Sequence, residues 1–319
     1  MRVAVTGAAG FIGSHLVEAL VNKGFFVIAI DSLNDDLYPR SVKELNWNLL
    51  KTLNGSVECI QVDLRDPIDE RIFHGCDAVF NLAAMPGLSL SWSNPKLYID
   101  SNLLVTCNLM SAMEKIPGVK FIQISTSSVY GKSVLGDENS PLQPISPYGV
   151  SKLAAENAVI AIGNAKGVLF SILRLFSVYG PRQRPDMAFN IFIKKMLIGE
   201  SISVFGDGSQ IRANTYVGDV VNGILLAYAN FESSSIYNLS GTQEYSVNQI
   251  LDISKNILNV EPRVEYVAER LGDQSRTTNV SEKAGRILGY KPETTIIEGL
   301  TRQINWQKAA FSPSGPQST

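Results

Sequence analysis

The chain has 319 residues, of which 45% are hydrophobic, and a formal net charge of −2. This length and apolar content suffice for a large core and a second lobe. Lysine and arginine are spread thinly along the sequence, without the basic stripe that a nucleic-acid backbone requires, so we expect no nucleic-acid partner.

Short apolar runs rich in β-branched residues alternate with amphipathic stretches over the first half of the chain. These runs predict strands at 3–5, 25–30, 57–62, 78–82 and 120–125, with helices between them, the first beginning near Phe11. A helix at 147–162 and a strand at 169–173 continue the alternation. Because parallel strands need crossover connections, which cover both faces of the sheet, the pattern predicts a doubly wound α/β fold.

The dipeptide Gly180-Pro181 interrupts this alternation and marks a predicted lobe boundary. Beyond it, helices at 187–198 and 247–257, a strand at 203–205 and many turn residues predict a smaller mixed α/β lobe, while 216–229 resembles a strand end and a helix that return to the first lobe. The predicted division assigns 1–178 and 213–238 to the first domain and 179–212 and 239–307 to the second. Residues 308–319 are predicted to be a disordered tail, because their end is small, polar and proline-rich.

Glycines at 7, 10 and 13 lie between the first predicted strand and the helix that follows. Gly7 would permit a tight turn, Gly10 a close approach to a phosphate, and Gly13 close packing of helix on strand, with the helix N-terminus facing a pyrophosphate. Three glycines alone can also be an ordinary turn. Asp31 strengthens the interpretation, since it ends the second strand, where a carboxylate can bind both ribose hydroxyls of adenosine and repel a 2′-phosphate. The expected cofactor is therefore NAD.

Tyr148 and Lys152 are four residues apart on a predicted helix, so both side chains leave the same face. An ammonium near a phenol favours the phenolate, and we expect it to lower the pKa of the tyrosine toward that of a general base. Such a pair is common on solvated helices. The serine- and threonine-rich run 125–128 at a predicted strand end supports a catalytic role, because a hydroxyl there can hold the reacting oxygen beside the tyrosine.

Five motifs, which agree in order and spacing, resemble those of the extended short-chain dehydrogenases/reductases, the NAD-dependent epimerase/dehydratase family with a Rossmann-type sheet. The resemblance covers residues 1–307, and its motifs are the glycine segment 6–13, Asp63-Leu64, Asn81-Leu82-Ala83-Ala84, Ser125 to Gly131, and Tyr148-Gly149-Val150-Ser151-Lys152.

The resemblance implies a role for each matching residue. Tyr148 is the general base, Lys152 binds the nicotinamide ribose and tunes the tyrosine, and Thr126 hydrogen-bonds the sugar O4. The residues expected to contact NAD are Gly7, Gly10, Phe11, Ile12, Gly13, Asp31, Asp63, Leu64, Leu82, Ala83, Ala84, Asn102, Ser125, Tyr148, Lys152 and Val178.

Two arginines of the second lobe, Arg212 and Arg270, match positions at which this family binds a diphosphate. Arginine suits phosphate because it stays charged and binds two oxygens at once. Val204 and Phe205 are expected to approach the nucleotide base. Either arginine alone could instead be an ordinary surface residue.

The residues after Thr126 bear on the reaction. Dehydratases of the family carry an Asp-Glu pair at the positions of Ser127 and Ser128, and the decarboxylases carry a glutamate at the second. Without a carboxylate there, an elimination is disfavoured. The resemblance then implies a 4-epimerase, in which C4 is oxidised, the keto sugar rotates, and hydride returns to its other face. A dehydratase or decarboxylase and a non-catalytic NAD-binding scaffold are the alternatives, although scaffolds of this superfamily usually lack the tyrosine or the lysine.

The segment 182–188 resembles bacterial UDP-glucuronate 4-epimerases and some UDP-glucose epimerases. A C6 carboxylate could be held by Ser127, Ser128, Ser177 and Arg184, which makes UDP-glucuronate the expected substrate and UDP-galacturonate its product. Alternatively Arg184 pairs with Asp186, and the substrate is UDP-glucose or UDP-N-acetylglucosamine. Ser89 stands where many relatives have an arginine, so the pocket near the sugar is expected to differ there.

Three distant cysteines, odd in number and without a Cys-x-x-Cys spacing, predict neither disulfides nor a metal site. The sequence contains no apolar run of membrane-spanning length and no leader, so we expect no membrane partner and a cytoplasmic location. By resemblance, helices near 95–113 and 147–162 would form the interface of a homodimer, although the same apolar faces could be internal core.

Overall fold

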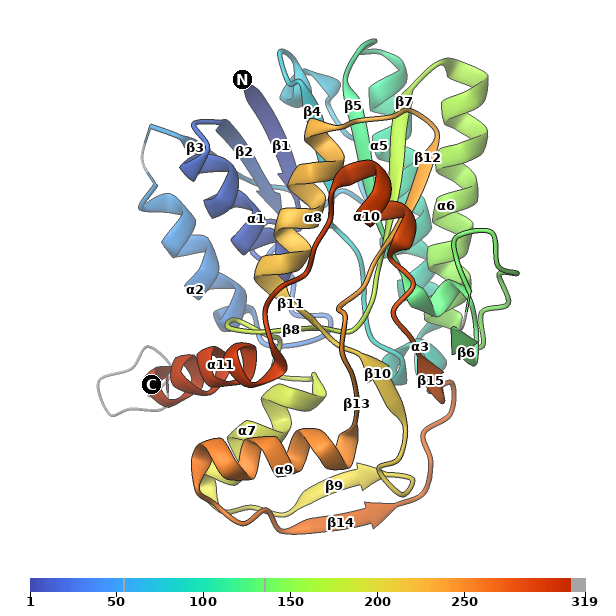
Figure 1. Ribbon diagram of the computed structural model, residues 1–319. Coiled ribbons are helices and arrows are strands. Elements are labelled where there is room, and N and C mark those ends of the chain that lie inside the picture. The colour runs from blue at the N-terminus through green and yellow to red at the C-terminus, as the bar shows by residue number, and fades with distance from the viewer. Residues whose placement is uncertain (54, 135, 311–319) are drawn as a thin grey trace.

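A seven-stranded parallel sheet forms the centre of the molecule (Figure 1). The structure is a computed structural model and describes residues 1–53, 55–134 and 136–310. The strand order is β12-β7-β5-β4-β1-β2-β3, and all neighbours run parallel. The predicted fold class, a Rossmann-type doubly wound α/β sheet with a smaller mixed lobe, is confirmed. The strands are β1 (Arg2–Thr6), β2 (Phe26–Asp31), β3 (Val57–Gln61), β4 (Ala78–Asn81), β5 (Lys120–Thr126), β7 (Leu169–Leu175) and β12 (Ser235–Leu239).

Helices cover both faces of this sheet. One face packs against α1 (Phe11–Asn22), α2 (Arg40–Lys51) and α8 (Val217–Ala229), and the other against α5 (Val105–Glu114) and α6 (Pro147–Lys166). The sequence delimits α6 at both ends. Its first turn begins with Pro147, the Ser146 side chain accepts a hydrogen bond from Gly149 N at 3.1 Å, and Gly167 ends the helix in the left-handed region.

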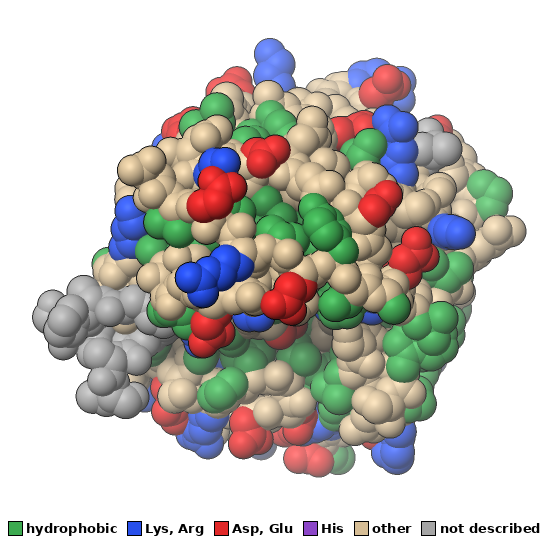
Figure 2. All heavy atoms as spheres, turned by 90° about the horizontal axis from the view of Figure 1, so that it is seen from below, with side chains coloured by type: hydrophobic (Ala, Val, Ile, Leu, Met, Phe, Trp, Pro, Cys, Tyr) green, Lys and Arg blue, Asp and Glu red, His purple; other side chains and the backbone are tan. Residues whose placement is uncertain are grey.

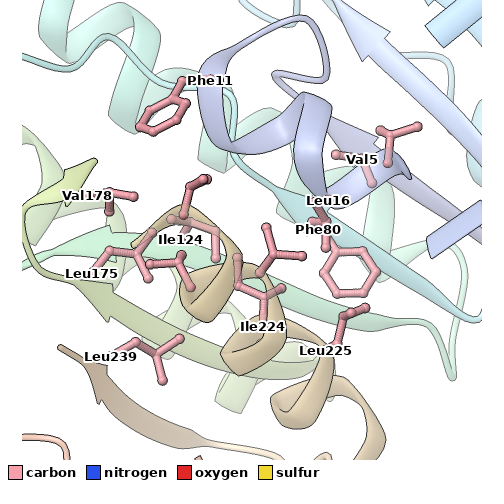
Figure 3. Close-up of a cluster of buried hydrophobic side chains, with 14 of the residues drawn as sticks. Val5, Phe11, Leu16, Phe80, Ile124, Leu175, Val178, Ile224, Leu225 and Leu239 are labelled. Carbon is pink, nitrogen blue, oxygen red and sulfur yellow. The ribbon is translucent and has the colours of Figure 1, made fainter. Parts of the chain in front are cut away.

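The larger hydrophobic cluster fills the space between the sheet and α1 and α8 (Figure 3). Leu16 of α1 and Ile224 and Leu225 of α8 face the strands, where Phe80 and Ile124 meet them. Burial of each such side chain contributes about 1.5–3 kcal/mol. The sheet and its helices therefore form a rigid base for the loops that leave the strand ends.

The second lobe is built from short strands and two helices. Its strands β9 (Ile202–Phe205) and β14 (Val264–Val267) pair in parallel, and α7 (Ala188–Ile198) and α9 (Val247–Leu258) pack on them. The other short strands are β6 (Ser133–Val134), β8 (Val178–Tyr179), β10 (Ile211–Ala213), β11 (Thr215–Tyr216), β13 (Glu244–Ser246) and β15 (Arg276–Thr277). The remaining helical segments are η1 (Glu70–Phe73), α3 (Ser89–Ser93), α4 (Pro95–Tyr98), η2 (Ile99–Leu104), η3 (Ser127–Val129), α10 (Glu282–Leu288) and α11 (Ile296–Ala310).

The predicted tail needs a correction. Residues 308–310 are the last residues of α11 and not a disordered segment, because Ile304, Gln307 and Ala310 are buried and hold the helix against the body. Residues 311–319 lie outside the described residues. The expected helix at 95–113 is also not uniform, since the π-helical η2 separates α4 from α5. The division into two domains remains a prediction.

Charged side chains of both signs are mixed on the lower face of the molecule (Figure 2). That face is formed largely by the second lobe (Figure 1). Among the described residues, no helix is both long enough and apolar enough to cross a bilayer.

Candidate active site

A cavity of about 630 Å³ opens at the carboxyl ends of the parallel strands and extends to the second lobe. The strand order reverses beside β1, where the crevice of a doubly wound sheet binds ligands. Most of the predicted site residues line this cavity: Gly7, Gly10, Phe11, Ile12, Gly13, Asp31, Asp63, Leu64, Leu82, Ala83, Ala84, Ser125, Thr126, Ser127, Ser128, Tyr148, Lys152, Ser177, Val178, Arg184, Arg212 and Arg270.

The glycine loop is too tightly packed to accept side chains. Gly7 has φ of +66°, and a Cβ on it would lie 2.8 Å from the backbone of Leu82. A Cβ on Gly13 would lie 2.1 Å from the Gly7 carbonyl oxygen. The loop therefore brings the N-terminus of α1, with its unpaired first-turn amides, to the cavity wall, and this donor set fits the pyrophosphate of a dinucleotide.

Asp31 ends β2 and is buried at the cavity wall. Its Oδ2 accepts a hydrogen bond from Ala9 N at 3.0 Å, and its Oδ1 accepts one from Leu33 N at 2.9 Å. Burial raises the pKa of this carboxyl, while the two amides and the nearby Lys43 ammonium oppose the rise. Each oxygen retains a lone pair, so the geometry fits the acceptance of ribose hydroxyls.

Asp63 is held by a neighbour that the sequence analysis did not identify. The Arg65 guanidinium binds both of its carboxylate oxygens at 2.6–3.0 Å and lowers its pKa. Arg65 also lines the cavity. The Asp63 carboxylate is thus already paired with Arg65. The same guanidinium lines the cavity, so it can also bind a ligand there.

Tyr148 and Lys152 of α6 and Thr126 of β5 all line the cavity. Lys152 Nζ donates to the Ile124 carbonyl oxygen at 2.6 Å, which fixes its side chain beside the strand end. The Tyr148 ring packs edge-on against Tyr98, with ring centroids 6.1 Å apart, and Thr126 hydrogen-bonds to the Tyr148 side chain. The three side chains predicted to be catalytic are therefore brought together by two neighbouring elements.

The electrostatics of this cluster differ from the expectation. Burial raises the pKa of Tyr148, and the Thr126 hydrogen bond and the Arg184 cation oppose the rise. Burial also lowers the pKa of Lys152 to about 8, while Glu156 opposes that change. The prediction of a lowered tyrosine pKa is thus wrong for the protein alone, because desolvation outweighs the Thr126 hydrogen bond and the Arg184 cation.

The serines expected around a sugar carboxylate line the same cavity as Arg184. Arg184 Nε and Nη2 bind the Asp186 carboxylate at 3.0 and 2.9 Å, which is the alternative that the sequence left open. A guanidinium has five donors, so this pair leaves those on Nη1 for another acceptor. The arginine can therefore bind Asp186 and an anionic ligand at once.

The predicted diphosphate arginines enter the cavity from the second lobe. The Arg270 guanidinium stacks on the Phe205 ring at 4.0 Å, and Arg212 Nη1 donates to the Ile211 carbonyl oxygen at 3.0 Å. Asp273 lies near both cations, which oppose the increase in its pKa that burial causes. Two half-buried cations at one end of a cavity suit a diphosphate group.

Three predicted residues do not line the cavity. Val204 is 1% exposed and packs in the core of the second lobe, and Phe205 supports Arg270 from behind. Asn102 is buried, and its side chain binds the backbone of Met85 at 2.7 and 3.0 Å and Ser151 Oγ at 2.8 Å. Their contacts with a ligand, expected from the sequence, therefore remain a prediction that the cavity lining does not support.

Several cavity residues carried no signal in the sequence, because they come from loops whose position depends on the fold. Asp273 could have been found, since it closes the Arg270-Leu271-Gly272-Asp273 motif. The others with polar or aromatic side chains include Tyr38, Lys43, Arg65, Tyr98 and Gln274. Among the described residues, no group of histidine, cysteine, aspartate or glutamate side chains could hold a metal ion.

The loop that carries Arg184 is anchored to α1 by His15. His15 Nε2 lies 2.9 Å from the Pro181 carbonyl oxygen, and its Nδ1 lies 2.9 Å from Arg182 Nη2. A carbonyl needs a donor and a guanidinium needs an acceptor, so the ring is the neutral Nε2–H tautomer. Burial and the Arg182 cation lower the pKa of His15 to about 4.

Acid is therefore expected to destabilise this anchor. The pKa of His15 falls from 6.5 in the unfolded chain to about 4 in the folded one, so below pH 6.5 the unfolded state binds a proton that the folded state excludes. The free energy of unfolding should drop by up to about 3 kcal/mol between pH 6.5 and pH 4. Urea unfolding across this range should show a shallower pH dependence in His15→Gln, and equal slopes in the two proteins would contradict the assignment.

Comparisons with known proteins agree in family and fold. The sequence model of the NAD dependent epimerase/dehydratase family matches residues 3–240. An uncharacterized UDP-glucose epimerase of Bacillus subtilis is 37% identical over 98% of this chain and 99% of its own length, and a UDP-glucuronate 4-epimerase of Thermodesulfobacterium geofontis is 35% identical over 95% of each. The structure of the UDP-glucuronic acid 4-epimerase of Bacillus cereus, in complex with UDP-glucuronic acid and NAD, superimposes with a TM-score of 0.94 at 35% identity, covering 98% of this chain and 100% of that one.

Proposed function

Because this chain belongs to the NAD-dependent epimerase/dehydratase family, we propose that it interconverts UDP-glucuronate and UDP-galacturonate by inversion at C4. The family predicted from the sequence motifs is confirmed, and the cofactor is NAD. The chain is an isomerase of the UDP-sugar 4-epimerase class, as the named relatives are. The choice of sugar is the part that we infer from the cavity.

The observation that carries this choice is Arg184, which faces the same cavity as Tyr148 and acts electrostatically on that tyrosine. Ser127, Ser128 and Ser177 line the same cavity. One cation and three hydroxyls suit a carboxylate, whereas the neutral C6 hydroxyl of UDP-glucose needs no cation. The position of Arg184 therefore favours a sugar acid.

The residues that would hold NAD, among them Asp31, the glycine loop and Lys152, all line the cavity. When bound, NAD supplies a hydride acceptor for C4 of the sugar and returns the hydride later in the same turnover. The fit rests on the glycine loop, which leaves no space for a Cβ and brings the N-terminus of α1 to the cavity, and on the acceptor oxygens of Asp31.

The side chains of the site divide the remaining work. As the phenolate, Tyr148 takes the proton of the sugar O4 hydroxyl and, as the phenol, later gives it back, while Thr126 orients the sugar oxygen. The Lys152 ammonium favours the phenolate through its charge. Arg212 and Arg270 hold the diphosphate, so that the oxidised sugar can rotate about its link without leaving the cavity.

The described carboxylates of the cavity wall do not occupy the positions from which dehydratases of the family supply an acid and a base. The described carboxylates of the cavity wall are Asp31 and Asp63 at the predicted cofactor end, Asp186 paired with Arg184, and Asp273 beside Arg212 and Arg270. Serines occupy 127 and 128, where dehydratases of the family carry acids. This supports epimerisation over dehydration or decarboxylation. The presence of both Tyr148 and Lys152 argues against a scaffold without activity.

Separate incubations with UDP-glucuronate, UDP-glucose and UDP-N-acetylglucosamine test the proposal. Analysis by mass spectrometry and NMR should show inversion at C4 without a change in mass, fastest with UDP-glucuronate. Loss of water or carbon dioxide would contradict epimerisation as the sole reaction. A higher kcat/KM for a neutral sugar would contradict the assigned substrate.

We also propose a homodimer. Ile99 and Leu104 on η2 and Val150 on α6 are 39%, 41% and 48% exposed, and they belong to the helices predicted to form the interface. Burial of such side chains between two copies would stabilise a two-fold assembly. Light scattering should give twice the chain mass of 34.8 kDa, and a monomer at micromolar concentration would refute the proposal.

A further inference from the structure

A buried ion pair lies behind the catalytic side chains. Arg174 Nη2 is 2.7 Å from Glu156 Oε2, and Arg174 Nε lies 3.1 and 3.2 Å from the two carboxylate oxygens. The side chains are 2% and 1% exposed. Neither residue lines the cavity, so the pair has no direct contact with a ligand.

Glu156 joins the helix of the catalytic pair to the strand that ends at Thr126. It lies on α6 one turn after Lys152 and two turns after Tyr148, on the same side of the helix. The Ser125 hydroxyl donates to Glu156 Oε1, and Ser125 directly precedes Thr126. One carboxylate thus fixes the distance between the two elements that carry Tyr148, Lys152 and Thr126.

Arg174 ties the same carboxylate to the rest of the sheet. Its Nη1 donates to Tyr130 Oη at 2.8 Å and to the Glu138 carbonyl oxygen at 3.2 Å, and Tyr130 Oη donates to Asn238 Oδ1 at 2.8 Å. The Glu138 carboxylate accepts from Asn238 N at 2.7 Å. This network satisfies the buried groups, so the cost of burying the charges is offset.

Glu156 is the carboxylate whose charge opposes the lowering of the Lys152 pKa. Lys152 Nζ donates to a backbone carbonyl and not to an acid, and burial lowers its pKa to about 8, against which Glu156 acts. The other ionisable groups around the cluster are Tyr148 on α6, Arg174 on β7 and Tyr130 after η3, while Arg184 and Tyr98 face Tyr148. Among these groups, Glu156 and Arg174 form an ion pair with each other, and neither of them lines the cavity.

We propose that Glu156 is a positioning residue for the reaction, which fixes α6 against the end of β5 and keeps a negative charge one helical turn behind Lys152. Its effect is to hold Lys152 as the ammonium at neutral pH, in the place where that cation favours the Tyr148 phenolate. This inference rests on the proposed function for the role of Lys152.

The test measures two quantities as a function of pH: the affinity for NAD, by calorimetry, and kcat for UDP-glucuronate. The alkaline limb of each profile is compared between variants. Loss of the Lys152 proton removes a donor and a charge, so both quantities should fall as the lysine titrates. In Glu156→Gln the midpoint of this fall should move about one pH unit lower. The double variant Glu156→Gln with Arg174→Met, in which no unpaired buried charge remains, should show the same shift if the single variant folds poorly.

Two controls separate position from general stability. Glu156→Asp keeps the charge and should keep the wild-type midpoint, even with a lower kcat. Glu138→Gln weakens the same network away from Lys152 and should also leave the midpoint unchanged. Superimposable profiles for the wild type and both Glu156→Gln proteins would overturn the inference. A wild type that turns over no UDP-sugar would refute the proposed function alone, because the NAD-affinity profile would still test Glu156.

Discussion

Tyr148→Phe is expected to lower kcat by about 10²- to 10⁴-fold, the range for loss of a positioned acid–base group. Phenylalanine keeps the ring that packs edge-on against Tyr98 but removes the hydroxyl that hydrogen-bonds to Thr126. Because Lys152, Asp31 and the glycine loop stay in place, the Kd for NAD should change little. Initial rates of C4 inversion, with NAD binding measured on the same preparation, check both parts.

Tyr98→Phe is the matched control for this variant. Tyr98 also lines the cavity, but its hydroxyl already donates to the Pro86 carbonyl oxygen at 3.0 Å. Its loss should therefore cost far less in kcat than loss of the Tyr148 hydroxyl. If Tyr148→Phe retained full activity, or if the two variants lost activity equally, Tyr148 would not be the general base.

The parallel sheet could be predicted because its signals are local. Most strands are short apolar runs, and several crossovers contain a glycine with a positive φ, such as Gly24, Gly75 and Gly118. The strand β12 was not identified, because Ser235–Leu239 is short and mixes polar with apolar residues. It joins the sheet only through its pairing with β7, which is distant in sequence.

Site residues that belong to a sequence motif could be predicted. Those that only the fold brings to the cavity could not. Tyr148 and Lys152 share a helix, so their spacing alone predicts that they lie side by side. Val204 and Phe205 show the limit of such reasoning, because neighbouring strand residues point to opposite faces and the two could not both approach one ligand. Val204 fills the core, while Phe205 lies under Arg270.

Electrostatics was the least predictable property. The spacing of Tyr148 and Lys152 favoured a lowered tyrosine pKa, but burial reverses the direction, and burial depends on the whole cavity. The ion pair of Glu156 with Arg174 was equally hidden. The two residues lie on different elements, and only the packing of α6 on β7 brings them within 2.7 Å.

Arg184→Met should reduce kcat/KM for UDP-glucuronate by about 10²-fold, since hydrogen bonds to charged groups contribute about 1.5–3 kcal/mol. In the proposed carboxylate site, Arg184 supplies the positive charge, and the other members, Ser127, Ser128 and Ser177, supply hydroxyls. Methionine keeps much of the apolar length of the side chain. The kcat/KM for UDP-glucose should fall far less, so the ratio of the two values measures the role of the cation.

Asp186→Asn provides the control, because Arg184 is already bound by that carboxylate. The amide releases part of the guanidinium and removes a negative charge close to the expected sugar acid. The KM for UDP-glucuronate should then stay the same or fall, whereas it rises in Arg184→Met. An equal loss of kcat/KM for both sugars in Arg184→Met would mean that the arginine organises the loop and does not bind the sugar carboxylate. In that case the alternative left open by the sequence, a purely structural pair with Asp186, would be the correct one.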